Sequence, residues 1–377
     1  MPFASLAALS LAISMAPEGT PSAAGSGSDL VRGPLFGVAV ERSEGGPHRV
    51  VSEAEGGKGV LSEGRLERRV LFEGTLEACE RAYLEELENR HGTGRWNFPF
   101  RTLGGKQLWA DELVYCGWRI QENVVTGHRR LLTPEYVRAA WGSYEACRVA
   151  LERVKIEKRL QPRSDRAVLL VHGLFRSKEC FRPMAEKLEA AGYEVATVGY
   201  PSTRRGISEH ADQLVKVLER LEGAKEVSFV AHSLGGLVVR EALGRESPWK
   251  RRLAVGRLVL IGTPNRGSAL AERLKDWFPF RAAAGRAGQE LSSDRVSKIP
   301  LPPCPFAVIA GGTGKDRGLN PLIPGDNDGV VEVESTKLPG ASGFLLLEAP
   351  HATMMRDPEV IEATARFLET GAFGQPP

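Results

Sequence analysis

The chain of 377 residues is long enough for one large domain with an appendage or for two domains of ordinary size. Hydrophobic residues make up 42% and charged residues 26%, an ordinary globular composition that excludes a chain disordered throughout. The formal net charge is only +3, from 50 basic and 47 acidic side chains, so the charge balance gives no indication of a nucleic-acid partner.

The cysteines predict neither a metal site nor a disulfide scaffold. No two of them form a C-x-x-C pair, so we expect no structural zinc. Their odd number argues against a complete disulfide framework and favours small buried thiols, with one disulfide beside leftover thiols as the alternative. The five are Cys79, Cys116, Cys147, Cys180 and Cys304.

An apolar run opens the chain over residues 2–16 and ends in the small-x-small pattern Ser14-Met15-Ala16. No Lys or Arg precedes it, so export, a disordered tail of a cytoplasmic protein and a wrongly assigned start all stay open. The run is too short to span a bilayer comfortably, and no later stretch of about 18 uncharged apolar residues follows, which excludes a polytopic membrane protein. Residues 17–28 have the composition of a flexible linker, so we assign residues 1–29 to this leading segment.

Residues 30–160 form the least readable part of the chain, and we expect an N-terminal α+β extension of unassigned function. Residues 31–64 fit either small strands or a poorly ordered arm. An amphipathic helix is expected over residues 75–89 with Thr75 as its N-cap. Strands are expected within residues 108–132, around a Thr-Gly turn.

A second helix of this extension is predicted over residues 133–154. Thr133 is its expected N-cap, and Pro134 would occupy the first helical position. Apolar side chains from Val137 to Val154 then follow a helical period.

From about residue 161 onward, apolar runs alternate with amphipathic helices, which is typical of a parallel sheet flanked by helices. This pattern predicts an α/β domain over residues 161–377. The predicted strands are 167–171, 194–199, 226–231, 258–262, 306–310 and 344–347. The predicted helices are 180–191, 208–221, 234–243 and 357–368.

The clearest motif is AHSLGG at residues 231–236, where an apolar strand runs directly into a serine and then into a helix. Such a turn strains the serine backbone and projects the hydroxyl at the C-terminal edge of the sheet. The residues two before and two after the serine must be very small, as Ala231 and Gly235 are. We therefore predict that Ser233 is a nucleophile. The alternative is a glycine-rich helix start with a capping serine.

A serine hydroxyl needs a base to remove its proton and an acid to orient that base. His351 is the predicted base because it follows the last predicted strand and precedes the final helix; a structural role is the alternative. The acid should lie between Ser233 and His351 in the chain. Asp328 is preferred because Gly329 permits a turn, and Asp326 is the runner-up. Either carboxylate could instead bond the local amides of a turn.

The oxyanion formed during acyl transfer needs two preorganised N–H donors. The first candidate is the backbone N–H of Leu234, directly after Ser233. The second is the N–H of Leu174, in the VHGL segment at residues 171–174 that ends a predicted strand.

Together these segments resemble the lipase and esterase branch of the α/β-hydrolase fold, especially bacterial triacylglycerol-lipase-like proteins. The resemblance covers about residues 166–368. It is carried by VHGL at 171–174, AHSLGG at 231–236, GTPNRGS at 262–268, NDGVV at 327–331 and HATMM at 351–355. The motif usually has Gly where this chain has Ala231, although A-x-S-x-G occurs among bacterial lipases. Membership implies hydrolysis of carboxylic esters through an acyl-enzyme, without a cofactor.

The resemblance also indicates where the acyl chain of a substrate would lie. GTPNRGS is similar to a loop that helps to form the wall of the acyl pocket in such enzymes, which makes Pro264 and Asn265 candidate pocket residues. Phe175 is a candidate for the same pocket or for a lid. Residues 270–298 carry Trp277 and Phe278 among basic residues, as would an amphipathic lid that opens in transient contact with a lipid surface. An ordinary cap helix with core aromatics is the alternative.

The expected function is hydrolysis of lipid or other acyl esters. A thioesterase, an amidase or an acyltransferase would keep the same three residues and differ in pocket shape or acceptor. A non-catalytic binding protein on the same fold usually lacks a member of the triad, and here every member has a candidate. The hypothesis of a membrane-surface module is supported only by the apolar run at the start of the chain and by the predicted aromatic lid.

Overall fold

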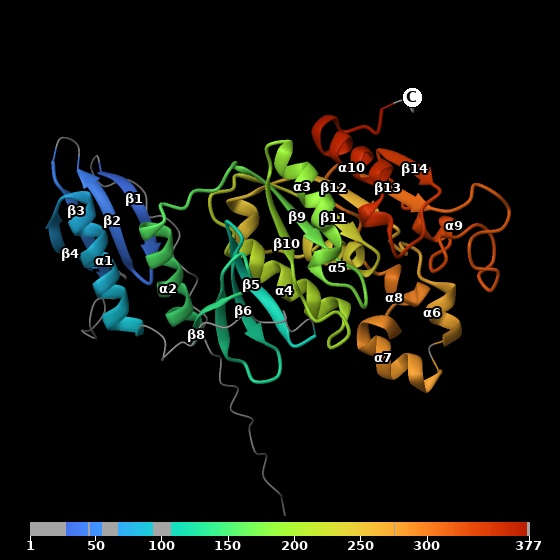
Figure 1. The fold of residues 1–377 in the computed structure, drawn as a ribbon, viewed down its shortest axis with the longest axis horizontal. Coiled ribbons are helices and arrows are strands. Elements are labelled where there is room, and N and C mark those ends of the chain that lie inside the picture. Colours follow the sequence, from blue (N-terminus) through green and yellow to red (C-terminus); the bar gives the residue numbers. More distant parts are fainter. Residues whose placement is uncertain (1–27, 44–45, 55–66, 93–106, 275, 375–377) are drawn as a thin grey trace, which may run out of the picture. The chain divides into compact units, whose positions relative to one another are not determined.

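Figure 1 shows the computed structural model, which describes residues 28–43, 46–54, 67–92, 107–274 and 276–374. The chain divides into two compact units, residues 1–87 and residues 88–377. The domain boundary predicted near residue 160 lies inside the second unit. The apolar run at the start of the chain lies outside the described residues, so its role stays a prediction.

The first unit contains a four-stranded antiparallel sheet in the order β1-β2-β3-β4. Its strands are β1 (Ser28–Leu35), β2 (Val38–Ser43), β3 (His48–Ala54) and β4 (Glu67–Gly74). Small strands, one of the two interpretations of this region, are therefore present. The helix α1 (Leu76–His91) follows, and Ala78 N–H donates a hydrogen bond to Thr75 Oγ1 (3.3 Å), which confirms Thr75 as the N-cap.

A second antiparallel sheet, in the order β5-β6-β7-β8, lies in the second unit. It consists of β5 (Trp109–Tyr115), β6 (Trp118–Asn123), β7 (Arg129–Leu132) and β8 (Arg138–Gly142). The strands predicted within residues 108–132 are thereby confirmed. The helix α2 (Tyr144–Glu157) packs on β6, β7 and β8, and together they bury a small apolar core that includes Leu113, Ile120, Leu131, Cys147 and Leu151.

The helix predicted from Thr133 is wrong over its first half. Thr133 Oγ1 accepts a hydrogen bond from Val137 N–H (3.3 Å) within the turn between β7 and β8. The helix begins only after Ser143, whose Oγ accepts from Ala146 N–H (3.1 Å). Residues 138–142 pair with β7 instead, because the backbone groups at the edge of β7 need partners and a hairpin supplies them. Tertiary pairing thus outweighs a local helical pattern.

Six parallel strands form the central sheet in the order β10-β9-β11-β12-β13-β14. All six predicted strands are present with small shifts at their ends. They are β9 (Arg166–Val171), β10 (Glu194–Val198), β11 (Glu226–His232), β12 (Ala254–Ile261), β13 (Phe306–Gly311) and β14 (Gly343–Leu347). The chain therefore has an α/β fold with an N-terminal extension.

The four predicted helices are present as α3 (Arg182–Ala190), α4 (Ile207–Glu219), α5 (Leu234–Leu243) and α10 (Pro358–Thr370). Residues of α4 and α5 pack against one face of the sheet, and residues of α3 and α10 pack against the other. Successive residues of β9 alternate between these faces, with Leu169 in the first cluster and Leu170 in the second. Burial of both faces explains why the strands read as continuous apolar runs.

The remaining helices lie in the connections between the strands and helices of the central sheet. Before α3 lies the 3₁₀ helix η1 (Lys178–Phe181), after α5 lies η2 (Pro248–Arg251), and before α10 lies η3 (Met354–Arg356). The insertion predicted as a lid forms α6 (Ala269–Leu274), α7 (Phe278–Gln289) and α8 (Ser293–Val296) between β12 and β13. The helix α9 (Val333–Thr336) lies between β13 and β14.

Neither a disulfide bond nor a membrane-spanning helix occurs among the described residues. All five cysteines are free, with Cys79, Cys147 and Cys180 buried. Within the described ranges, the structure contains no helix with the length and apolar character that crossing a membrane requires.

Buried histidines make the stability of the fold sensitive to acid. Burial is the main cause that lowers the pKa of His172 and of His210 from 6.5 to about 4, so both imidazoles are neutral in the folded chain at pH 7. Between pH 6.5 and pH 4 the unfolded chain binds more protons than the folded chain. The stabilisation is therefore complete above pH 6.5 and is lost as the pH falls toward 4.

We predict that the free energy of unfolding, measured by urea titration, falls between pH 7 and pH 4. Replacing the buried His210 with Gln should reduce this fall by on the order of 3 kcal/mol, because one proton-linked group is removed. The matched control is His128→Gln, at an exposed histidine of the same unit. A His210→Gln variant with the full wild-type pH dependence would contradict the assignment.

Candidate active site

Ser233 lies on the turn between β11 and α5 with φ +54° and ψ −126°. A residue with a side chain rarely adopts this conformation, so the turn is strained and must be held by its surroundings. Ser233 N–H donates to the carbonyl of Ile261 at the end of β12 (2.9 Å), and Gly236 N–H donates to the carbonyl of Ser233 (3.0 Å). The neighbouring strand and the first turn of α5 therefore hold the serine in place.

Close backbone packing explains the small residues of the motif. A Cβ built on Gly235 would lie 2.3 Å from the carbonyl oxygen of Val171, and a Cβ on Gly236 would lie 2.1 Å from Thr263 Oγ1. On the other side, a Cβ on Gly173 would lie 2.8 Å from the Cβ of Ser233. The end of β9 and the start of α5 thus approach each other too closely for any side chain.

The imidazole of His351 lies between Ser233 and Asp328. Its Nε2 is 3.0 Å from Ser233 Oγ, and its Nδ1 is 2.6 Å from Asp328 Oδ2. In addition, His351 N–H donates to the backbone carbonyl of Asp328 (2.9 Å). Both residues are buried, with exposed fractions of 7% and 2%. The structure therefore brings the three residues predicted from the sequence into one hydrogen-bonded array.

The two oxygens of Asp328 have different partners. Oδ1 accepts hydrogen bonds from the N–H groups of Val330 (3.0 Å) and Val331 (2.8 Å), whereas Oδ2 faces His351. Gly329 has φ +99°, the left-handed conformation that this turn requires. The sequence left open whether this carboxylate orients the base or bonds the amides of its own turn, and it does both.

Asp326, the runner-up, is used elsewhere. Its Oδ1 accepts from Thr313 N–H (2.8 Å) and its Oδ2 accepts from Gly314 N–H (2.9 Å). A Cβ on Gly312 would lie 2.6 Å from Oδ2 of the same carboxylate. Asp326 therefore stabilises the loop after β13 through hydrogen bonds within that loop, and both of its carboxylate oxygens have partners.

Two neutral imidazoles lie beside the site. His232 Nε2 is 3.0 Å from the carbonyl oxygen of His351, so this nitrogen donates, and the two ring centroids are 4.6 Å apart. Burial, followed by the proximity of His351, holds the pKa of His232 well below 6.5. Burial also lowers the pKa of His172 to about 4. Neither ring carries charge at neutral pH, so neither one opposes the positive charge that would form on His351 if it accepted a proton.

Tyr200 was not singled out by the sequence, yet it contacts the segment next to Ser233. Its hydroxyl donates to the carbonyl of His172, and its ring stacks on the His172 imidazole with centroids 4.3 Å apart and an interplanar angle of 12°. No local pattern marks such a tyrosine, because its partner lies 28 residues earlier in the chain.

The two predicted oxyanion donors belong to segments that adjoin Ser233. Leu234 is the first residue of α5, and the first N–H groups of a helix have no partner within that helix. Leu174 follows Gly173, the residue that packs against Ser233, and its side chain is partly buried against the core.

The predicted pocket and lid residues fall into two groups. Phe175 (φ +57°), Trp277 and Phe278 have exposed side chains, with exposed fractions of 56%, 58% and 78%. By contrast, Pro264 and Asn265 are buried.

The amide of Asn265 is occupied by other partners. Its Oδ1 accepts from Arg240 Nη1 (3.0 Å), and its Nδ2 donates to the carbonyl of Thr336 (2.7 Å). Asn265 also lines a cleft of about 530 Å³ with Arg240 and Lys298, and Ser233 is not among the described residues that line it. The acyl pocket at Pro264 and Asn265 therefore stays a prediction.

A metal centre was not expected from the sequence. In the part of the chain that the structure describes, no three His, Cys, Asp or Glu side chains gather as ligands of a metal ion.

Comparisons with known proteins match parts of the chain. A family model described as "Domain of unknown function (DUF7379)" matches residues 137–282. No curated protein matches the sequence. Among solved structures, the chain is similar to the lipase BlEst2 of Bacillus licheniformis in its mature form, with 21% identity and a TM-score of 0.46. That match covers 54% of this chain and 91% of the lipase.

Two further solved structures are similar over about half of this chain. The metagenomic carboxyl esterase MGS0156 has 22% identity and a TM-score of 0.43, over 54% of this chain and 76% of the esterase. The phospholipase PlaB from Legionella pneumophila has 17% identity and a TM-score of 0.37, over 46% of this chain and 45% of the phospholipase. At these identities and TM-scores, the similarities do not establish the chemistry of this chain.

The topology itself identifies the fold. The parallel order β10-β9-β11-β12-β13-β14 places a serine on a strained turn directly after β11 and before α5. An acidic residue after β13 and a histidine after β14 follow in that chain order. A parallel sheet with such a strained serine turn and with Ser, Asp and His in this chain order has the α/β-hydrolase fold.

Proposed function

We propose that this chain is a serine hydrolase that cleaves carboxylic esters of lipids or other acyl compounds through an acyl-enzyme intermediate. The observation that carries the proposal is the continuous array from Ser233 Oγ through His351 to Asp328 Oδ2, with distances of 3.0 and 2.6 Å. The serine of this array is the one that the strained turn presents at the edge of the sheet.

The first half of the reaction forms the acyl-enzyme. Ser233 Oγ attacks the carbonyl carbon of the ester while His351 Nε2 accepts its proton. Asp328 Oδ2 accepts a hydrogen bond from His351 Nδ1–H, which fixes the tautomer and stabilises the imidazolium that forms. The tetrahedral intermediate then collapses, the bond to the leaving oxygen breaks, and His351 Nε2 returns its proton to that alkoxide. An alcohol leaves, and the acyl group stays on Ser233.

The second half removes the acyl group with water. His351 Nε2 accepts a proton from a water molecule whose oxygen attacks the acyl carbon, and a second tetrahedral intermediate forms. When this intermediate collapses, Ser233 Oγ departs and receives the proton from His351. A carboxylic acid is released, and the array returns to its first state without any cofactor.

Both intermediates carry a negatively charged oxygen. We assign its two donors to the backbone N–H groups of Leu234 and Leu174. The assignment is supported by the position of Leu234 at the positive end of α5 and by the packing of Gly173 against Ser233. Rigid donors of this kind stabilise the oxyanion without a reorganisation cost at the moment of reaction.

Pro264 and Asn265 stay the candidates for the wall of the acyl pocket and Phe175 for that pocket or a lid, and we assign contact with a lipid surface to Trp277 and Phe278. The exposure of both lid aromatics supports this assignment, because large apolar side chains that face water lower their free energy by entering an interface.

Covalent labelling tests whether Ser233 is a nucleophile. A fluorophosphonate should label the wild-type chain, and Ser233→Ala should abolish both the label and ester turnover, the latter by at least about 10³-fold. Intact-mass spectrometry and peptide mapping would locate the adduct. Labelling that persists in Ser233→Ala would place the adduct on another residue and refute Ser233 as the nucleophile, whereas no labelling of a folded wild-type chain would favour a binding protein on this fold.

The choice of acid can be tested with two neighbouring carboxylates. Asp328→Asn should lower kcat by on the order of 10⁴-fold, because an amide at this position favours the wrong tautomer of the base. Asp326→Asn removes a carboxylate of the same loop whose partners are Thr313 and Gly314, and it should lower stability while retaining most of kcat. The reverse ranking of the two kcat values would show that Asp326 is the acid.

A series of nitrophenyl esters of increasing chain length would define the acyl group. If Trp277 and Phe278 contact lipid, long-chain esters above their micellar concentration should react faster, and Trp277→Ser with Phe278→Ser should remove that stimulation while leaving short esters unaffected. Turnover of thioesters without turnover of any ester would refute ester hydrolysis and favour the thioesterase alternative.

A further inference from the structure

The antiparallel sheet β5–β8 contacts the central sheet next to the proposed site, at Asp111 of β5. Asp111 N–H donates to the carbonyl of Gly199 (2.8 Å), and Asp111 Oδ2 accepts from Gly199 N–H (2.7 Å). Gly199 directly follows β10, the edge strand of the parallel sheet. Backbone and side chain of one residue therefore hold the C-terminal end of β10.

Arg119 of β6 completes this contact. Its Nη1 donates to Asp111 Oδ2 (2.6 Å) and to the carbonyl of Thr197 (2.7 Å), and its Nη2 donates to Thr197 Oγ1 (3.1 Å). On the other carboxylate oxygen, Asp111 Oδ1 accepts from Gln121 Nε2 (2.7 Å). Two residues of the antiparallel sheet thus hold β10 at Thr197 and at the residue that follows the strand.

Asp111 is fully buried and charged. Burial is the largest influence and raises the pKa of its carboxyl, but Arg119, Lys178 and the hydrogen bonds together outweigh it, so the pKa lies below its usual value. A buried ion pair of this kind is costly to break, because the remaining charge is left without a partner. The contact is therefore rigid at neutral pH.

A continuous path leads from this contact to Ser233. Tyr200, the next residue after Gly199, donates its hydroxyl hydrogen to the carbonyl of His172 and stacks on its ring. His172 precedes Gly173, which packs against Ser233, and Leu174, the second proposed oxyanion donor. Each step as far as Gly173 is a covalent bond, a hydrogen bond or a ring contact, and Gly173 then packs closely against Ser233.

The same segment is held a second time, at its far end. Lys178 of η1 is buried, and its Nζ lies 4.4 Å from the centre of the Tyr136 ring, which belongs to the turn between β7 and β8. A Cβ on Gly199 would lie 3.6 Å from Lys178 Cδ. The loop from residue 172 to residue 178 therefore contacts the antiparallel sheet and the end of β10 together.

We propose that Asp111, paired with Arg119, is a positioning residue of the oxyanion hole. It fixes the end of β10, so that Tyr200 and His172 keep the N–H of Leu174 directed at the reacting oxygen. This inference depends on the proposed hydrolase function and gives the antiparallel sheet a part in it. A displacement of about 1 Å at such a donor is enough to slow a reaction by roughly 10²-fold.

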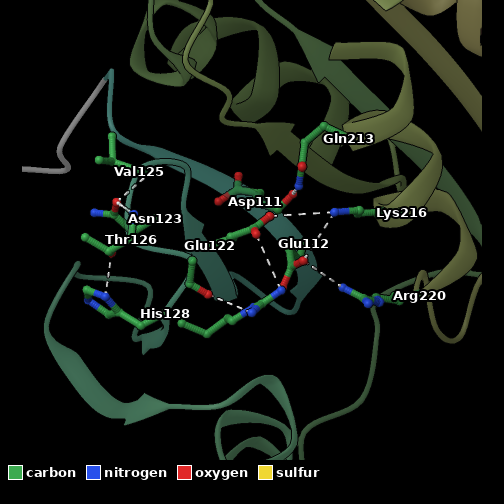
Figure 2. A network of polar contacts seen from close by, with 12 residues as sticks. Asp111, Glu112, Glu122, Asn123, Val125, Thr126, His128, Gln213, Lys216 and Arg220 are labelled. Atoms are coloured by element: carbon green, nitrogen blue, oxygen red, sulfur yellow. Dashed lines mark hydrogen bonds and ion pairs between the residues drawn. The ribbon is translucent and has the colours of Figure 1, made fainter. Parts of the chain in front are cut away.

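Glu112 provides a matched control on the same strand. Glu112 lies at an irregularity in the pairing of β5 with β6 and is buried as deeply as Asp111, but it has different partners. Figure 2 shows it near Lys216 and Arg220, with distances of 3.7 and 3.5 Å, and Arg129 Nε lies 3.3 Å from its other oxygen. Its partners hold the sheet to α4 and are separate from the path to Leu174.

The test compares Asp111→Asn with Glu112→Gln in the full chain. Asp111→Asn should lower kcat for a nitrophenyl ester, and the rate of fluorophosphonate labelling, by about 10- to 100-fold, with KM changed by about twofold or less. The pH midpoint of kcat should stay at its wild-type value, because the array of Ser233, His351 and Asp328 is not altered. Glu112→Gln should keep kcat within about threefold of the wild-type value, even if it lowers Tm as much as Asp111→Asn does. Equal losses of kcat in the two variants, or none in Asp111→Asn, would overturn the proposal.

A second measurement does not depend on activity. Hydrogen exchange of the backbone amides of residues 172–175 should be about tenfold faster in Asp111→Asn and unchanged in Glu112→Gln. Should Asp111→Asn fail to fold, Tyr200→Phe removes only the hydroxyl that donates to His172 and should also increase this exchange and lower kcat. Unchanged hydrogen exchange of residues 172–175 in the folded variants would refute the positioning role of Asp111. A wild-type chain that turns over no ester, with exchange altered as expected, refutes the hydrolase function alone.

Discussion

Parallel pairing in the central sheet is the constraint on which the site depends. Because β9, β11, β13 and β14 run in one direction, the segments that follow them all emerge at one edge of the sheet. Ser233 and His351 lie 118 residues apart in the chain, yet Ser233 Oγ and His351 Nε2 are 3.0 Å apart at this edge. Reversal of β13 or β14 would carry Asp328 or His351 to the opposite end of the sheet, and no side chain is long enough to compensate.

The second requirement is that the sheet withstands strain at one residue. Ser233 has a backbone conformation that costs on the order of 1–3 kcal/mol, and it persists only because its surroundings leave no alternative. The strands on both sides of β11 are buried on both faces, and α5 packs so closely on the end of β9 that Gly235 has no room for a Cβ. Close packing of the core thus maintains the strained backbone conformation of Ser233, which an isolated turn would relax.

The antiparallel sheet β5–β8 is an integral part of the second unit. It contributes two neighbouring buried carboxylates, Asp111 toward β10 and Glu112 toward α4. Buried charges are destabilising unless each has partners, and here several cations and amide groups surround them. Such contacts favour one specific docking of the two sheets over a loose apolar contact, and a reaction that depends on the placement of N–H donors benefits from that specificity.

The sequence by itself determined the local features. The six strands and their helices, the serine turn and the order of serine, acid and base follow from the period of apolar residues and from small side chains next to Ser233, because these patterns depend on neighbours within a few positions. Only the tertiary structure decided between Asp326 and Asp328, since both carboxylates suit the same turn and differ in which one faces His351. It also made residues 138–142 a strand, because β7 offers hydrogen-bond partners that no local pattern reveals. The tertiary structure likewise decided the contacts of Asp111, Arg119 and Tyr200, whose partners here lie 28 to 88 residues away along the chain. The local spacing of side chains does not reveal contacts between residues this far apart.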